Sequence, residues 1–282
     1  MEIYQRLLTT TVPEVVVVGS EGLVDGIIGF IQKIIQKIID GIKWIFSKIF
    51  SSSKESTIKA TEEKMKNGTP KKSIAYTKPV MYAIADGMAG DTSKCNSHIV
   101  AYVGELEKTH TKIQDRMTKH SNQMQPGLLK ALEKVTIKKI EEEFFLSHRS
   151  SVKVNFDPNS ADHSNSIFKV THGSRDFSKP EKITENLELR EETCNKCFSV
   201  FGKLMAKRKL FQALFDKIHD AWAKDYTNLA RSKEIAEIPD LKLRLETFRI
   251  EVSTITALAE MFDKEHEIFT ALCQQMYETK GK

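Results

Sequence analysis

The chain has 282 residues, enough for a large hydrophobic core in one or two domains. Hydrophobic residues make up 40% and charged residues 29%, which excludes an intrinsically disordered chain. The net charge of +5 permits contact with nucleic acid or an anionic surface without requiring it. Four cysteines at irregular spacing form no disulfide framework and indicate a reducing compartment. The start of the chain contains acidic residues and predicts no secretory signal.

Residues 23–50 are the most apolar stretch, and "GIIGFIQKIIQKIIDGIKWIFSKIF" places isoleucines along one face of a helix. Lysine and aspartate recur within it, and residues such as Lys37 and Asp40 would cost roughly 2.5–3.5 kcal/mol each at the centre of a bilayer. The segment is therefore predicted to be an amphipathic helix and not a membrane span. The helix is expected either to dock on a partner or a membrane or to pack as one more helix of the bundle. The residues expected to dock on a partner or a membrane are Ile31, Ile34, Ile35, Ile38, Ile42, Trp44 and Ile45.

Residues 51–73, "SSSKESTIKATEEKMKNGTPKKS", contain almost no apolar side chains and predict a solvated linker. This break in composition divides the chain into two parts. Residues 1–62 form an N-terminal leader with the amphipathic helix and the polar linker, and residues 63–282 form a helical body.

Apolar residues of the body alternate at spacings of three and four, which is typical of coiled-coil seams. One helix is expected to end at Pro126-Gly127, with a second, "LLKALEKVTIKKIEEEFF", returning antiparallel to it. Two more helices are expected, from about Glu181 and after Ile238-Pro239. The seam positions of the helix that ends at Pro126-Gly127 are Ile99, Val103, Leu106, His110, Ile113, Met117, His120 and Met124. Those of the helix from about Glu181 are Leu187, Cys194, Cys197, Phe201, Leu204, Phe211, Phe215, Ile218, Trp222 and Leu229. Those of the last helix are Leu245, Phe248, Val252, Ile255, Ala259, Phe262, His266, Phe269, Cys273 and Met276.

Two alternating segments, "SVKVNF" and "SIFKVTHG", flank "DPNSADHSN" and predict a small β-hairpin inserted around residues 150–180. The predicted fold class is all-α. It is an elongated antiparallel helical bundle with coiled-coil-like seams, this hairpin insertion and a detached N-terminal amphipathic helix.

The sequence carries no recognisable catalytic signature, so we expect a protein that is not an enzyme and holds no metal or cofactor. The pair "CNKC" at Cys194 and Cys197 lies on an apolar seam without a second ligand pair, which favours buried helix cysteines over a zinc or redox site. His110, His120 and His266 also occupy seam positions, where a satisfied core histidine is commoner than a ligand. The basic stretch "KLMAKRKLF" is interpreted as solvated surface.

The opening "MEIYQRLL" resembles the capsid-targeting sequence of internal head proteins in T-even-type phages. The resemblance implies a leader that directs the protein into the prohead and is then removed by the prohead protease. Relatives in giant tailed phages are cut after a small residue, any residue and Glu. Such triplets end here at Glu21, Glu55 and Glu62, whereas the T-even pattern, with Leu or Ile two residues before the Glu, is absent.

The first functional hypothesis is a non-enzymatic phage virion protein, made in the host cytoplasm and packaged inside the head through its processed leader. Its expected partners are scaffold or capsid proteins and the prohead protease, with packaged DNA and further copies of the chain as additional candidates. The alternative is a membrane-active helical protein whose residues 23–50 bind or insert into a lipid bilayer.

Overall fold

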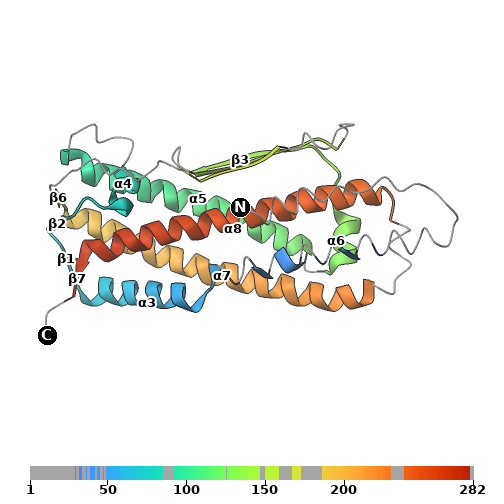
Figure 1. The fold of residues 1–282 in the computed structure, drawn as a ribbon, viewed down its shortest axis with the longest axis horizontal. Coiled ribbons are helices and arrows are strands. Elements are labelled where there is room, and N and C mark those ends of the chain that lie inside the picture. The colour runs from blue at the N-terminus through green and yellow to red at the C-terminus, as the bar shows by residue number, and fades with distance from the viewer. Residues whose placement is uncertain are drawn as a thin grey trace.

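The fold was analysed in a computed structural model, which is mostly helical with small antiparallel strand pairs (Figure 1). This outcome agrees with the predicted class at that level. The structure describes residues 29, 32–33, 36, 39–41, 43–44, 47, 49–84, 92–124, 126–146, 150–158, 167–172, 186–229 and 238–279.

Four helices run along the length of the molecule: α3 (Ser52–Asn67), α5 (Cys95–Met124), α7 (Glu191–Leu229) and α8 (Leu241–Met276) (Figure 1). Helices α5 and α7 are parallel, because Asn96 accepts a hydrogen bond from Thr193 near the start of both. Helix α8 runs the opposite way: its Glu265 accepts a hydrogen bond from Tyr102 near the start of α5.

The predicted antiparallel return of a second long helix after α5 is wrong. Helix α6 (Leu128–Lys134) has only two turns, and β3 (Ile140–Leu146) follows it. The Glu- and Lys-rich composition suggested a helix, but Ile140, Glu142 and Phe144 alternate toward the helices in a strand that is paired along its whole length with β4 (Ser150–Phe156). Pairing and burial of one face outweigh a modest helical propensity.

The predicted β-hairpin is confirmed as β4 and β5 (Ile167–His172), which pair antiparallel with Val152 opposite Val170. With β3 they form a three-stranded sheet in the order β3-β4-β5. Val152, Val154 and Phe156 are buried, so this face of β4 packs against the helices.

Two further strand pairs join segments that are distant in sequence. Strand β1 (Thr69–Pro70) pairs with β7 (Tyr277–Glu278) directly after α3 and α8, and β2 (Ser73–Ile74) pairs with β6 (Leu187–Glu188). The short helices α4 (Lys78–Ile84) and η1 (Thr92–Lys94) precede α5. Helix α7 begins at Glu191, about ten residues later than expected, because Leu187 belongs to β6.

The hydrophobic core has two parts. The sheet cluster lies beneath the three-stranded sheet, and the end cluster lies near the strand pairs β1-β7 and β2-β6. The sheet cluster includes Ile113, Met117, Leu132, Ile140, Val152, Phe156, Phe211, Phe248, Ile255 and Phe262, and the end cluster includes Ile58, Met65, Ile99, Val103, Leu106, Cys194, Cys197, Phe201, Leu204, Phe269, Cys273 and Met276.

All ten seam positions predicted on α8, and those on α5 from Ile99 to His120, are buried. The predicted periodicity therefore identified the inward face of α5. Helix α8 is buried on nearly every side, since Thr247, Thr254 and Leu258 between the predicted positions are buried as well. The side chains of Met124, Phe215, Ile218, Trp222 and Leu229 lie outside the described residues.

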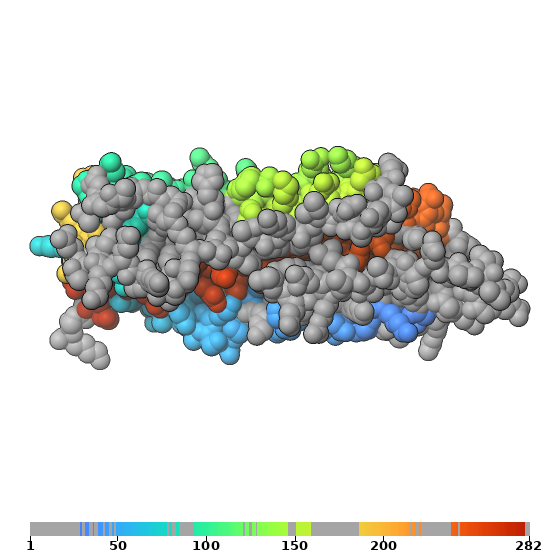
Figure 2. Space-filling view, turned by 45° about the horizontal axis from the view of Figure 1, so that its top comes forward, coloured from blue at the N-terminus to red at the C-terminus, as the bar shows by residue number. Residues whose placement is uncertain are grey.

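The prediction of a solvated linker at residues 51–73 is wrong. Residues Ser52–Asn67 form α3, which packs lengthwise against α8 and lies along part of one long side of the molecule (Figure 2). Its buried residues are Ile58, Thr61 and Met65. These residues are three and four positions apart, so they lie on one narrow face of the helix. The prediction failed because it used the low apolar content of the whole segment and not this spacing.

Candidate functional site

The described part of the N-terminal segment packs against the body. Residues 29, 32–33, 36, 39–41, 43–44, 47 and 49 are helical, and Ile39 and Ile49 belong to the sheet cluster at 5% and 4% exposure. The prediction of a detached helix is therefore wrong for this part of the chain. Trp44 is 38% exposed, on the side away from the core. The other six predicted docking residues, Ile31, Ile34, Ile35, Ile38, Ile42 and Ile45, lie outside the described residues.

The centre of this contact is Arg208 of α7, which is 2% exposed. Its Nε donates to Oε1 of Glu55 at 2.8 Å, and its Nη1 donates to Oδ1 of Asp263 at 3.2 Å. Its Nη2 donates to the carbonyl oxygen of Ile49, and its guanidinium lies 4.9 Å from the ring centroid of Phe50. One side chain thus joins α7, α8, α3 and the chain just before α3.

The interpretation of "KLMAKRKLF" as solvated surface is correct for Lys209 and wrong for Arg208. Lys209 is exposed, whereas the adjacent arginine is among the most buried charges of the molecule. Composition does not separate the two, because the turn of the helix alone decides which cation faces inward.

Lys54 adds a second cation to the cluster. Its ammonium pairs with Asp263 and lies 2.6 Å from Oε1 of Glu267, so α3 and α8 are joined again. Burial alone would lower the pKa of Lys54, but these two carboxylates outweigh it and raise the pKa. Burial raises the pKa of Asp263, and the neighbouring cations Lys54 and Arg208 oppose this effect.

A groove of about 260 Å³ lies beside this cluster, between α3 and α8. Its lining combines the paired charges with Thr57, Ile58 and Thr270. Because Lys54 and Arg208 already have carboxylate partners, the arrangement holds helices together and leaves no cation in the groove for an anionic ligand.

Two buried histidines lie next to the groove. The rings of His110 and Phe262 are 4.2 Å apart, and the ring of His266 stacks on Phe262 at 5.9 Å. Burial lowers the pKa of His266 to about 3 and that of His110 well below its ordinary value. Both imidazoles are therefore neutral at neutral pH. The expectation of satisfied core histidines is wrong for His110, since neither ring nitrogen has a hydrogen-bond partner among the described residues, whereas Nδ1 of His266 lies 3.5 Å from the hydroxyl of Thr270.

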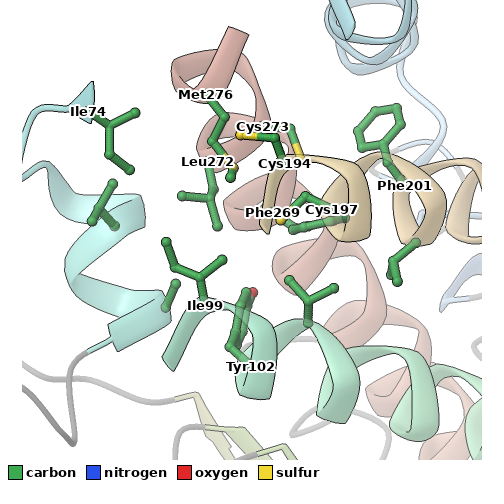
Figure 3. Packing of buried hydrophobic residues seen from close by; sticks show 14 of the residues in the cluster. Ile74, Ile99, Tyr102, Cys194, Cys197, Phe201, Phe269, Leu272, Cys273 and Met276 are labelled. Carbon is green, nitrogen blue, oxygen red and sulfur yellow. The ribbon is translucent and has the colours of Figure 1, made fainter. Parts of the chain in front are cut away.

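Cys194, Cys197 and Cys273 lie together in the end cluster, beside Phe269 and Met276 (Figure 3). All are fully buried free thiols, as is Cys95. Burial raises the pKa of Cys194 to about 11 and that of Cys273 well above its ordinary value, so these thiols are protonated. Burial agrees with the interpretation of "CNKC" as core cysteines.

The candidate cleavage positions Glu55 and Glu62 both lie within α3. Glu55 is bound to Arg208, and Glu62 accepts a hydrogen bond from Lys66 one turn later. Glu21 lies outside the described residues.

Within the described ranges, His, Cys, Asp and Glu side chains form no group of three arranged to hold a metal ion. None of the described helices is long and apolar enough to cross a membrane. No family model, no curated protein and no solved structure matches the chain.

Proposed function

We propose that the protein is a non-enzymatic component of a tailed-phage virion, directed into the prohead by its leader, from which the prohead protease then removes residues 1–21. The opening "MEIYQRLL" and the triplet "GSE" ending at Glu21 support this function through their resemblance to internal head proteins. The partners are then scaffold or capsid proteins and the protease. The protein is made in the host cytoplasm.

The burial of Ile39 and Ile49 in the sheet cluster is the observation that carries the choice of cleavage site. Cutting after Glu55 or Glu62 would cut through α3 and disconnect these buried side chains from the rest of the body, and proteases cut most readily in exposed chain and not in packed helices. Glu55 is also held by Arg208. Glu21 is the remaining candidate, and cutting there keeps residues 29–50 with the body in the mature protein.

We further propose the finer architecture of a bundle with coiled-coil-like seams. Its support is the burial of α5 at three- and four-residue spacing, from Ile99 to His120. Helix α8 is antiparallel to α5 and α7 in this architecture, while α5 and α7 are parallel.

The test is the mass of the protein recovered from purified phage particles. A mature chain that starts at Gly22 is expected, and Glu21→Gln should leave the leader in place. Glu55→Gln and Glu62→Gln are matched controls that should be processed normally. A mature N-terminus after either of these residues, or absence of the protein from particles, would contradict the proposal.

The membrane-active alternative has one observation in its favour. Trp44 is 38% exposed and the neighbouring Lys43 is also exposed, a pairing that suits the interface of an anionic bilayer. Binding of the full chain to phosphatidylglycerol vesicles, weakened by salt and by Trp44→Ser, would support this function. Absence of such binding would exclude it.

A further inference from the structure

A second, smaller cavity lies at the other end of the body, where α5 ends and α6 begins. Its volume is about 50 Å³, enough for one tetrahedral oxyanion and far below the roughly 300 Å³ of a typical site for a drug-sized ligand. Side chains from α5, α6, the segment after α6 and α8 line it. The polar ones are His120, Gln123, Lys134, Thr136, Lys138 and Glu251.

His120 is the buried member of this lining, at 2% exposure. Its Nδ1 lies 3.7 Å from Oε2 of Glu251, and its Nε2 has no hydrogen-bond partner among the described residues. A buried ring nitrogen without a partner is costly, so its presence beside a polar cavity points to a group that binds there.

Cations gather around the cavity. Lys134 and Lys138 are exposed at its rim, and neither forms an ion pair within the described part of the chain. Lys119 is also exposed, and its charge acts together with that of Lys138 on the carboxyl of Glu251. In contrast to the cluster around Arg208, this site presents ammonium groups that have no close carboxylate partner.

The remaining charges nearby do not cancel this excess. Arg116 is bound to Glu142 at 3.0 Å, which neutralises both. The carboxylate of Glu251 lies on the Nδ1 side of the His120 ring, 3.7 Å from that atom, and as a single negative charge it does not offset Lys119, Lys134 and Lys138. The Nε2 atom and the two lysines remain as donors for an anion.

We propose that this cavity binds a phosphate group of a nucleic-acid backbone. Lys134 and Lys138 supply positive charge, and Gln123 and Thr136 supply neutral donors. The ring of His120 takes up a second proton as the anion binds, so that Nδ1 donates toward Glu251 and Nε2 donates to the anion from the buried side. The exposed Lys119, whose charge also acts on Glu251, extends the positive surface toward a neighbouring phosphate. The binding of an oxyanion stands on the cavity alone, whereas the choice of DNA as its source rests on the proposed function.

The first experiment compares the full chain with Lys134→Ala/Lys138→Ala in binding to a duplex DNA of arbitrary sequence, over a series of salt concentrations. The double variant should bind at least about ten-fold more weakly, and the slope of log affinity against log salt should fall by about two, close to 0.9 for each lost contact. Lys59→Ala/Lys264→Ala is the control, because it removes two exposed lysines from α3 and from a part of α8 about 20 Å from Glu251. Equal losses in both variants, or no binding by the wild-type chain, would overturn the proposal.

The second experiment tests the cavity itself with sulfate ion, which keeps its charge across neutral pH. His120→Leu should abolish saturable sulfate binding, and His120→Gln, which retains a donor, should restore part of it. Urea unfolding of both variants separates loss of the site from loss of the fold. Unchanged sulfate affinity in a folded His120→Leu variant would overturn the site.

Vesicles containing phosphatidylglycerol form the third arm. Binding to these vesicles with no binding to DNA would reassign the phosphate to a lipid headgroup and overturn the choice of DNA. None of these outcomes depends on cleavage after Glu21. Failure of the phosphate site and failure of the virion assignment are therefore distinguishable.

Discussion

The guanidinium of Arg208 on α7 lies 2.8 Å from the carboxylate of Glu55 on α3, although the two residues are 153 positions apart in the chain. The same guanidinium contacts Asp263 of α8 and the carbonyl oxygen of Ile49. Because that one cation reaches α3, α8 and the chain just before α3, we expect it to contribute to how firmly α3 and the preceding segment are held on the body.

Arg208→Met should therefore lower the free energy of unfolding by about 1–3 kcal/mol, since it removes the partner of the partly exposed Glu55 and leaves Asp263 with Lys54 alone. The measurement is urea unfolding followed by far-UV circular dichroism. Lys209→Met, which removes the exposed neighbouring cation, should change stability by less than about 0.5 kcal/mol. Equal stability of the two variants would show that the cluster contributes nothing to holding α3.

Gly68 ends α3 where the chain passes close to β7. A Cβ atom there would lie 2.3 Å from the carbonyl oxygen of Glu278 and 2.4 Å from that of Lys64. Gly68→Ala should cost about 1–3 kcal/mol, because backbone must move to accept the methyl group. Gly104→Ala in α5 is the matched control, since nothing lies within 4 Å of its Cβ, and it should stabilise the protein by about 0.5–1 kcal/mol. Thermal unfolding of both variants gives the comparison, and a neutral Gly68→Ala would contradict the close approach.

Stability should fall on acidification below about pH 6.5 because of the buried histidines His110, His120 and His266. Their folded-state pKa values are depressed, to about 3 for His120 and His266, so between that pH and 6.5 the unfolded chain binds more protons than the folded one. Each histidine then contributes a loss of about 1.4 kcal/mol per pH unit, or roughly 4 kcal/mol for the three.

Urea unfolding at several pH values from neutral to about 5 measures this slope. His266→Leu replaces the titrating imidazole by an apolar side chain of similar size, so it should reduce the slope of unfolding free energy against pH by about a third. An unfolding free energy that stays constant down to about pH 5 would show that these rings take up protons in the folded state.

The cysteines should be unreactive while the protein is folded. Cys197 and Cys273 are fully buried, and burial raises the pKa of their thiols, so little thiolate exists to attack a reagent. A thiol-specific reagent should label them only in denaturant. Cys194→Ala with Cys197→Ala should cost about 1–3 kcal/mol and leave bound metal unchanged. Rapid labelling of the native protein, or zinc that this double variant loses, would contradict the assignment.

The sequence by itself determined the inward face of α5. Ile99, His110 and His120 are buried there because regular three- and four-residue spacing leaves a helix only one apolar side to cover. Helix α8 is buried on nearly every side, which its predicted seam did not indicate. The hairpin of β4 and β5 was predictable for a similar reason, since alternation in "SVKVNF" suits a half-buried strand.

Tertiary structure decided the features that depend on partners distant in the chain. Segment Ser52–Asn67 was predicted to be a linker because few of its residues are apolar. In the structure it is a packed helix, because α8 covers Ile58 and Met65. The same holds for β3, which becomes a strand because β4 satisfies its backbone hydrogen bonds. The burial of Arg208 needs carboxylates from α3 and α8, because a buried charge is tolerated only when partners neutralise it, and no pattern local to "KLMAKRKLF" carries that information.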